Sequence, residues 1–382
     1  MMEVEQGGSA KTQTTSDLVS PLAGRKVPPG SLINVSRLLT DYFTLTPEPQ
    51  VPAQRVIFGT SGHRGSAHDR SFNEGHVLAI TQAICDDRQQ RKIDGPLFLG
   101  IDTHALSESA RASVLQVLAA NGVLVQLAGE GQYTPTPAIS LAIVTHNRGR
   151  QSRLADGIVL TPSHNSPRDG GFKYNPPHGG PAGQEVTGRI ESVANQYLDR
   201  GLVGVRRISV ARALTASTTA RYDFMSAYVE DLSNVIDLEL LRAAQVRMAV
   251  DPMGGAGVHY WPAIAERLRL DITVLNPSVD PTFSFMRLDW DGKIRMDPSS
   301  AYVMQALVER RAAFDVLFAC DTDHDRHGIV CESMGLFSSN QYLPLAIDYL
   351  LRTRTQWSPH TAVGKSVVST ALIDAVVKGL GR

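Results

Sequence analysis

The sequence of 382 residues has few cysteines, almost no net charge and no long apolar run. Three cysteines, odd in number and widely spaced, favour reduced thiols over a disulfide framework. A formal charge of −1 supplies no basic field for nucleic acid or an anionic membrane surface. No apolar run reaches the roughly eighteen residues of a membrane span, and the polar first twenty residues do not resemble a signal peptide. These absences predict a cytoplasmic protein with neither nucleic-acid nor membrane partners.

The length and the hydrophobic content predict more than one domain. Hydrophobic residues make up 42% of the chain, and single cores stop growing at roughly 250–300 residues. Helical and strand patterns alternate along most of the sequence, which is typical of α/β domains with mostly parallel sheets. Strands are expected at 97–101, 123–127, 157–160, 246–250, 272–275, 314–319 and 366–369, and helices at 107–121, 184–198, 299–311 and 371–380.

The predicted domain order starts with a tail and lead-in over residues 1–55. A first domain is expected at 56–207, a second at 208–332, and the start of a third at 333–382. The last unit holds too few strands to close a sheet, so we expect the natural protein to continue past Arg382.

Three aspartates, Asp321, Asp323 and Asp325, alternate directly after an apolar run and crowd the end of a predicted strand. Unpaired, they would raise one another's pKa values, whereas Mg²⁺ neutralises them and leaves positions for a phosphate oxygen. The alternatives are a solvated acidic turn and a calcium loop that ends at Glu332. Arg326 opposes the calcium loop, because it fills the place where the sharp turn needs glycine. We predict one phosphate-linked Mg²⁺ site per chain.

Ser163 follows the predicted strand at 157–160, at the sheet edge where ligands usually bind. His164 is adjacent, and Lys173 lies beyond Gly170-Gly171, interpreted as a bend that brings the ammonium back towards the hydroxyl. A turn or helix-cap serine is the structural alternative. A serine hydroxyl needs a base or a cation to become nucleophilic. No Gly-x-Ser-x-Gly elbow of an esterase surrounds this serine.

Two segments are rich in glycine. Residues 58–65, Phe-Gly-Thr-Ser-Gly-His-Arg-Gly, can aim backbone N–H groups and Arg64 at one anion, but they lack the ending of a nucleotide P-loop. Taken alone, this segment is more often a turn. Residues 251–257 have the wrong spacing for a dinucleotide fingerprint and predict a structural turn. For His104 the sequence leaves two interpretations open, a packing role and contact with a phosphate.

Taken together, residues 58–65, Thr-Pro-Ser-His-Asn at 161–165, Gly-Gly-Phe-Lys at 170–173 and Asp-Thr-Asp-His-Asp-Arg at 321–326 resemble the α-D-phosphohexomutase superfamily, most of all its bacterial phosphoglucomutase branch. The resemblance runs from about Val56 to Arg382. It implies successive α/β domains with mixed, mostly parallel sheets, of which the third is incomplete and the fourth absent.

The resemblance also implies a role for each motif. Ser163 would be a phosphoserine whose phosphate completes an Mg²⁺ sphere with the three aspartates. The other residues expected to take part in catalysis are Lys173 as general acid or base, Arg64 and Arg326 as stabilisers of the phosphoryl charge, and His164 as part of the serine's pocket. The residues expected to bind substrate are Thr60, Ser61, His63, His104 and Asn165.

The implied activity is that of an isomerase that transfers phosphate within a hexose. It would interconvert glucose 1-phosphate and glucose 6-phosphate, with glucose 1,6-bisphosphate as intermediate and activator, in a monomer or homodimer. Two departures stand out: Ser166 replaces the family's usual proline and offers a second hydroxyl, and the Gly-Glu-Glu-Ser-type loop that reads the sugar hydroxyls does not occur. Glucose and mannose specificity therefore both stay open, and we expect reduced activity. The alternative is a non-catalytic sugar-phosphate or metal-binding protein, which the intact Ser163, Lys173 and Asp321 disfavour.

Overall fold

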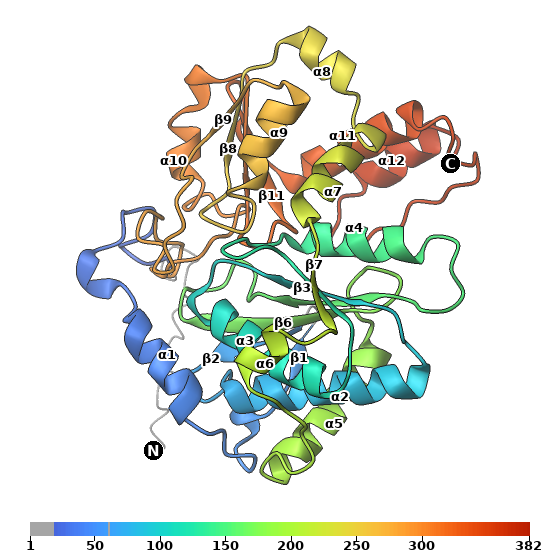
Figure 1. Cartoon of the computed structure of the whole chain (residues 1–382). Helices are drawn as coiled ribbons and strands as arrows, with labels where there is room; N and C mark the ends of the chain where they lie inside the picture. The colour runs from blue at the N-terminus through green and yellow to red at the C-terminus, as the bar shows by residue number, and fades with distance from the viewer. Residues whose placement is uncertain (1–18, 60–61) are drawn as a thin grey trace, which may run out of the picture.

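The computed structural model describes residues 19–59 and 62–382. In this part of the chain two sheets lie one above the other in the view of Figure 1, each flanked by helices, and a pair of C-terminal helices projects to one side. The mixed α/β architecture predicted from the sequence is confirmed.

The first sheet has the strand order β1-β2-β6-β5-β3-β4-β7. Strands β5, β3, β4 and β7 run parallel, whereas β1, β2 and β6 continue the sheet in antiparallel pairing. Its strands are β1 (Phe58–Gly59), β2 (Gly62–Ser66), β3 (Leu97–Ile101), β4 (Val125–Leu127), β5 (Asp156–Leu160), β6 (Asp169–Asn175) and β7 (Thr219–Arg221). The accompanying helices are α1 (Val35–Thr44), α2 (Glu74–Arg91), α3 (Ala105–Ala120), α4 (Thr136–Asn147), α5 (Gln184–Asp199) and α6 (Val210–Leu214).

The second sheet has the order β12-β11-β10-β8-β9, with β10, β8 and β9 parallel. Its strands are β8 (Met248–Asp251), β9 (Ile272–Val274), β10 (Val316–Cys320), β11 (His327–Cys331) and β12 (Gly335–Phe337). The remaining helices are α7 (Phe224–Asp231), α8 (Leu238–Ala244), α9 (Tyr260–Leu268), α10 (Gln305–Val308), α11 (Ser339–Thr353) and α12 (Leu372–Gly379). Short 3-10 turns lie at η2 (Pro29–Ser31), η3 (Pro52–Gln54), η4 (Leu232–Asn234) and η5 (Arg311–Ala313).

The central strands β3 and β5 are buried along their whole length. Strands covered on both faces read as continuous apolar runs, which is why the sequence pattern locates these two well. A shared hydrophobic cluster then joins the two halves of the molecule. Phe98 and Ile139 from the first half pack there with Phe224, Tyr260 and other side chains from the second. The two sheets therefore hold a fixed relation, and their carboxyl ends meet at the site described below.

The described part of the lead-in also joins the two halves. The backbone N–H of Ser20 donates to the carbonyl of Trp290 (2.7 Å), and that of Gly24 donates to Leu288 (2.8 Å). Helix α1 then packs on α3, where the Tyr42 hydroxyl donates to Ser113 Oγ (3.1 Å). We call residues 19–34 the strap. Of the tail and lead-in predicted at 1–55, residues 1–18 lie outside the described residues.

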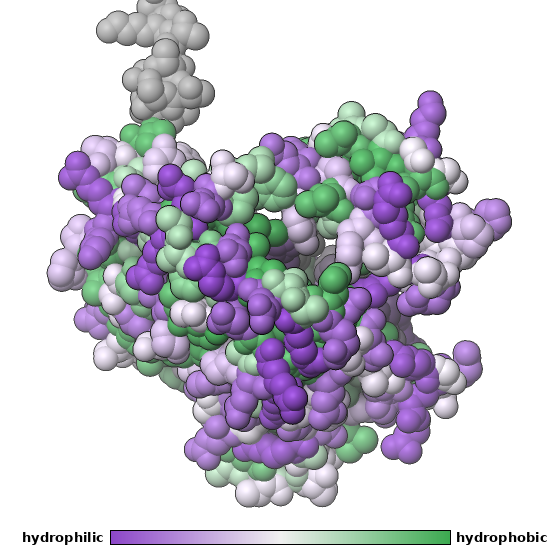
Figure 2. Space-filling model, turned by 90° about the horizontal axis from the view of Figure 1, so that it is seen from above, coloured by the Kyte–Doolittle hydropathy of each residue, from purple (hydrophilic) through white to green (hydrophobic). Residues whose placement is uncertain are grey.

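The C-terminal part differs from the sequence prediction. The strand expected at 366–369 is a turn, and α11 and α12 pack against each other. Large hydrophobic side chains gather exposed in this region, among them Leu345, Val367 and Val368. Seen from above, the surface is mostly hydrophilic, with hydrophobic residues on a lobe at the upper right (Figure 2). Among the described helices none has the length and hydropathy to cross a membrane.

Gly171 provides a test of the packing behind the site. A Cβ at this position in β6 would lie 2.1 Å from the carbonyl oxygen of Thr161, a backbone atom that cannot move aside cheaply. We expect Gly171→Ala to lower the free energy of unfolding by about 1–3 kcal/mol, measured by urea titration. The matched control is Gly188→Ala in α5, where a Cβ meets nothing within 4 Å and helix propensity predicts a gain of about 0.5–1 kcal/mol. Equal stability of the two variants would contradict this packing.

Candidate active site

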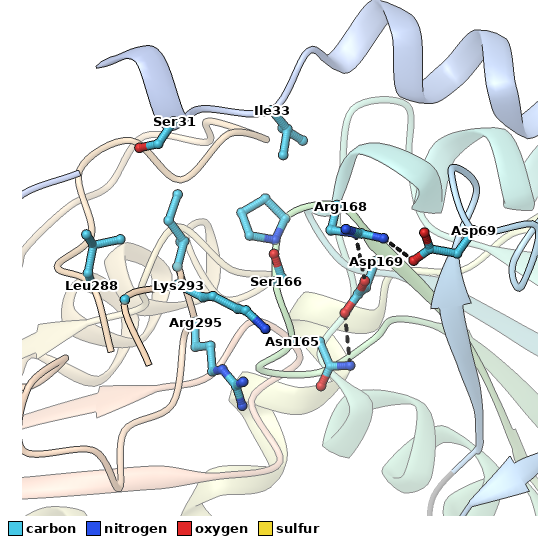
Figure 3. A pocket seen from close by; sticks show the side chains of 13 residues that line it. Ser31, Ile33, Asp69, Asn165, Ser166, Arg168, Asp169, Leu288, Lys293 and Arg295 are labelled. Atoms are coloured by element: carbon cyan, nitrogen blue, oxygen red, sulfur yellow. Dashed lines mark hydrogen bonds and ion pairs between the residues drawn. The ribbon is translucent and has the colours of Figure 1, made fainter. Parts of the chain in front are cut away.

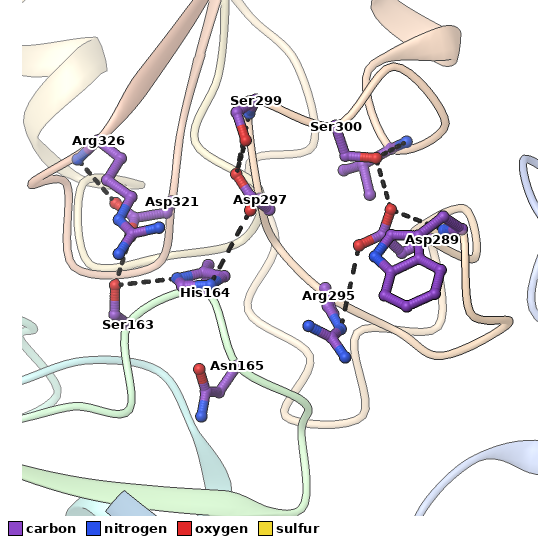
Figure 4. Close-up of polar contacts among 12 residues, drawn as sticks. Ser163, His164, Asn165, Asp289, Arg295, Asp297, Ser299, Ser300, Asp321 and Arg326 are labelled. Atoms are coloured by element: carbon purple, nitrogen blue, oxygen red, sulfur yellow. Dashed lines mark hydrogen bonds and ion pairs between the residues drawn. The ribbon is translucent and has the colours of Figure 1, made fainter. Parts of the chain in front are cut away.

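Ser163 lies in the loop between β5 and β6, fully buried, with a left-handed backbone (φ 58°) that is strained for serine. Its N–H donates to Thr161 Oγ1 (2.8 Å). Its hydroxyl donates to Asp321 Oδ2 (2.7 Å), although 158 positions separate the two residues. The Thr322 hydroxyl donates to the Ser163 carbonyl. Figure 4 shows the serine hydroxyl between Asp321 and His164. The strained turn is thus held from both halves of the molecule.

A buried hub beneath the loop fixes the serine turn further. Asp102 accepts hydrogen bonds from the hydroxyls of Thr161 and Ser107, both at 2.6 Å. His104 places Nδ1 2.8 Å from Asp102 Oδ2 and Nε2 3.2 Å from the carbonyl oxygen of Asn165. Burial opposes a charge on His104, but Asp102 outweighs it and raises the pKa. Because both ring nitrogens face acceptors, His104 suits the doubly protonated form.

The three aspartates of the loop after β10 offer ligand oxygens that all lie within 4.8 Å of one another. Asp321 and Asp323 are buried, whereas the Asp325 side chain is 34% exposed. Burial, followed by the charges of Asp323 and Asp325, raises the pKa of Asp321 well above its usual value. The N–H of Arg326 donates to Asp321 Oδ1 (3.1 Å) and offsets part of this cost. The crowding expected from the sequence is therefore present.

Lys173 supplies positive charge to this group of carboxylates. Its Nζ donates to Asp323 Oδ2 and Asp325 Oδ2, both at 2.7 Å. Burial disfavours the ammonium ion, but the two aspartates prevail and raise its pKa. For Asp323, burial is likewise outweighed by Lys173, and its pKa is lowered.

The residues fit a hard divalent cation. Three carboxylates converge, the Ser163 hydroxyl adjoins Asp321, and one buried oxygen, Asp323 Oδ1, has no hydrogen-bond partner among the described residues. Buried polar atoms are rarely left unsatisfied. Carboxylate and hydroxyl oxygens are the donors that Mg²⁺ prefers.

The glycine-rich segment 251–257 supports the aspartate loop from below. A Cβ on Gly255 would lie 2.5 Å from Thr322 Cα, and one on Gly257 would lie 2.0 Å from the His324 ring. The N–H of Ala256 donates to the Thr322 carbonyl (2.7 Å). These glycines permit close backbone approach and form the structural turn that the sequence predicts.

The sequence analysis missed several residues that position the site. Asp297 Oδ2 lies 3.9 Å from His164 Nε2, while its other oxygen accepts from the N–H and hydroxyl of Ser299 at 2.9 and 2.7 Å. His164 Nδ1 in turn lies 3.5 Å from Ser163 Oγ. At the start of α4, the Thr136 hydroxyl donates to Asp323. The only sequence signal was the turn pattern after Asp297, which is too common to identify a site.

The other predicted site residues fall into three groups. Arg64 hydrogen-bonds Asn165 Oδ1 (3.3 Å) beside the serine loop, and burial lowers its pKa. His63 and His104, predicted to bind substrate, are both buried: the His63 ring stacks on Phe72, and His104 Nε2 lies 3.2 Å from the carbonyl oxygen of Asn165. Thr60 and Ser61 lie outside the described residues.

Two family models match this arrangement: "Phosphoglucomutase/phosphomannomutase, alpha/beta/alpha domain I" over residues 55–200, and domain II of the same family over residues 226–335. Together they cover more than half of the chain. The chain therefore belongs to the phosphoglucomutase/phosphomannomutase family within the α-D-phosphohexomutase superfamily, which confirms the resemblance.

Among individual relatives, a phosphoglucomutase of Komagataeibacter xylinus is 52% identical over 364 residues, which are 95% of this chain and 66% of the relative. Phosphoglucomutase 1 of Drosophila melanogaster is 25% identical over 85% of this chain and 59% of its own length. A Thermus thermophilus structure assigned as a phosphomannomutase is 26% identical and superposes with a TM-score of 0.68, covering 88% of this chain and 68% of that one. The chain thus spans about two thirds or less of these two curated relatives.

Burial of His63 and His76 predicts loss of stability in acid. Their rings stack at 5.3 Å, and burial lowers the pKa of His63 to about 4 and that of His76 to about 3. Well above pH 6.5 both are neutral in either state, and their contribution is complete. As the pH falls from 6.5 towards 4, only the unfolded chain takes up these protons. The free energy of unfolding should then fall by up to about 1.4 kcal/mol per histidine per pH unit.

The measurement is urea unfolding between pH 4.5 and 7.5, comparing the natural chain with His63→Phe. The variant keeps a ring in the stack and should show a shallower dependence on pH. His360→Phe, at an exposed position, is the control and should keep the full slope. A slope unchanged by His63→Phe would show that this ring is accessible to protons in the folded protein.

The carboxylate group should bind divalent cations. We expect Mn²⁺, followed by electron paramagnetic resonance, to bind at one site, and Asp323→Asn to weaken that binding by about tenfold or more. Asp315→Asn, which alters a surface ion pair with Arg247 just before β10, is the matched control and should bind Mn²⁺ as the natural chain does. Unaltered affinity in Asp323→Asn would place the cation elsewhere.

Proposed function

We propose that the chain carries out phosphoryl transfer through Ser163, in the manner of a phosphoglucomutase. The observation that carries the proposal is the 2.7 Å contact between Ser163 Oγ and Asp321 Oδ2, which unites the serine and the carboxylates in one buried centre. A serine used only for packing has no need of three carboxylates beside it. Phosphoryl transfer depends mainly on positioning and on neutralising charge, which is what this centre supplies.

In the proposed reaction, the Oγ–P bond of phosphorylated Ser163 breaks while a P–O bond forms to a free hydroxyl of a hexose phosphate. The net transfer of the proton is from that sugar hydroxyl to Ser163 Oγ, so the products are a free serine hydroxyl and a hexose bisphosphate. In the second half-reaction the bisphosphate gives its other phosphate to Ser163 Oγ, and the serine proton passes to the sugar oxygen that loses the phosphate. This restores the phosphoserine and releases the isomeric monophosphate. One serine serves both half-reactions.

Around the serine, the chain's cations take distinct roles. Arg64 beside the serine loop and Arg326 beside the aspartates supply positive charge to the phosphoryl oxygens. Lys173 holds its proton firmly, because Asp323 and Asp325 raise its pKa. In this arrangement Lys173 is therefore a proton donor, and it becomes a base only after its partners' charge is otherwise neutralised.

Asp321, Asp323 and Asp325, with the Ser163 oxygen, would hold Mg²⁺, which neutralises charge on the phosphoryl group when bound. His164 and Asp297 form a wall of the serine's pocket. Asn165 keeps the loop in register through its contacts with Arg64 and His104.

The proposed substrates are glucose 1-phosphate and glucose 6-phosphate, with glucose 1,6-bisphosphate as the phosphorylating intermediate. The 52% identical phosphoglucomutase supports this choice over a mannose epimer. The cytoplasmic location and the monomeric or dimeric state remain predictions.

Incubation with glucose 1,6-bisphosphate and Mg²⁺ should add one phosphate, seen by intact mass and mapped to Ser163. Ser163→Ala should abolish the gain, because the acceptor oxygen is lost. Ser166→Ala removes the neighbouring hydroxyl of the same loop and should accept phosphate as before. Phosphate gained by Ser163→Ala but not by Ser166→Ala would assign the chemistry to Ser166 and overturn the mechanism.

A further inference from the structure

A cavity of about 570 Å³ lies beside the serine loop, outside the group formed by Ser163 and the aspartates. Its walls come from the strap, from residues 165–169 of the serine loop and from residues 288–295 (Figure 3). It includes neither Ser163 nor any of the three aspartates. The volume falls within the range of small-molecule sites. We call it the strap pocket.

One wall of the strap pocket is cationic. Lys293 and Arg295 reach from the same segment towards Asn165 and Ser166 (Figure 3). The Lys293 side chain is 67% exposed, and its Nζ lies 3.7 Å from Asp291, too far for a hydrogen bond. Arg295 is tied more closely to Asp291, at 2.7 Å. The Lys293 ammonium group is therefore exposed and can donate hydrogen bonds to a ligand, while the ion pair with Asp291 holds Arg295 beside it.

The serine loop adds an unused hydroxyl to this wall. Ser166 lines the pocket, and its hydroxyl forms no hydrogen bond within the described part of the chain. Its side chain gives the pocket a hydrogen-bond donor and acceptor at this point. A lysine, an arginine and a hydroxyl together suit a phosphate group better than a single carboxylate, because a phosphate offers more acceptor oxygens.

The opposite wall has a different character. Asp69, Arg168 and Asp169 line it, and Ile33 of the strap adds an apolar side chain to the pocket. Asp69 pairs with Arg168, and Asp169 accepts from Asn165 Nδ2 (3.2 Å). Their remaining lone pairs can accept from ligand hydroxyls, whereas they would repel a second phosphate. The asymmetry favours a ligand with one anionic end and one hydroxylated end.

We propose that the strap pocket binds a small phosphorylated sugar or polyol, with its phosphate against Lys293 and Arg295 and its hydroxyls towards Asp69 and Asp169. The pocket shares Asn165 of the serine loop with the proposed phosphoryl-transfer centre, but it includes neither Ser163 nor the three aspartates and uses none of that centre's chemistry. A bound ligand would contact the strap and the serine loop at once and would hold the two together.

The test is protection of Lys293 from acylation by an N-hydroxysuccinimide ester, quantified by peptide mass spectrometry. Glycerol 3-phosphate is the probe. At ten times its dissociation constant it should slow Lys293 acylation by about tenfold, while Lys378, exposed on α12, is acylated at an unchanged rate. Equal rates with and without the probe at Lys293, or equal slowing of Lys293 and Lys378, would overturn the proposal.

Further arms separate the possible ligands. Inorganic phosphate protecting as well as glycerol 3-phosphate would show that the hydroxyl-binding wall contributes nothing and would overturn the sugar or polyol assignment. If glycerol, which has no phosphate, protected Lys293 as well as glycerol 3-phosphate does, the proposed role of the phosphate would be overturned. Arg295→Gln should abolish protection and Ser166→Ala should weaken it, whereas Arg310→Gln, outside the pocket, should keep it. These readouts need no phosphorylation of Ser163, so they remain decisive if the proposed transfer reaction fails.

Discussion

The structure depends on one electrostatic constraint: three carboxylates in a mostly buried loop need compensating positive charge. Asp321 shows the cost: burial and the charges of Asp323 and Asp325 raise its pKa, so it takes up a proton more readily than an exposed aspartate. The protein distributes the compensation among a lysine from the first sheet, a backbone N–H and a hydroxyl at the start of α4. The backbone N–H belongs to Arg326 of the loop itself, whereas the lysine and the hydroxyl come from the other half of the molecule. Folding the two halves together therefore supplies most of the compensation, and it also brings Ser163 to the loop.

The backbone around the site shows how closely the two halves must approach. The Thr322 hydroxyl bonds to the Ser163 carbonyl, and the Thr136 N–H donates to the Asp323 carbonyl (2.8 Å). Glycines at 255 and 257 leave room for the aspartate loop, while the shared core around Phe98 and Tyr260 fixes the sheets behind it. Apolar packing in the shared core fixes the orientation of the two sheets relative to each other. Polar contacts at the carboxyl ends of their strands fix the positions of the serine loop and the aspartate loop. The left-handed strain at Ser163 persists because so many contacts determine its position.

The sequence predicts the buried strands and the chemistry-bearing motifs better than it predicts their connections. Strands β3 and β5 are apolar runs covered on both faces, so their pattern is unambiguous. Strand β6 was missed, because Gly170-Gly171 was interpreted as a bend. Both glycines serve instead to let the strand pass Phe72 and the Thr161 carbonyl. Helix α4 is not among the predicted helices, because Pro135 and Pro137 are typical of a turn. Proline is nevertheless tolerated in the first turn of a helix, and here Pro135 is the N-cap and Pro137 lies in the first turn. The long helix expected at 299–311 is only partly helical: turns precede α10 (Gln305–Val308), and the 3-10 turn η5 (Arg311–Ala313) follows it.

Asp297, Thr136 and Asp102 could not be predicted, because their importance arises only from tertiary neighbours. The proposed role of Lys173 likewise depends on its tertiary neighbours. Its motif predicts an acid or a base, but only the structure shows that Asp323 and Asp325 share its ammonium. Those carboxylates also belong to the proposed cation site, so Lys173 and a cation bound there would share the same oxygens. A divalent ion there would weaken the hold on the lysine proton. In the proposed mechanism, metal occupancy and proton transfer by Lys173 are therefore coupled through the two shared carboxylates.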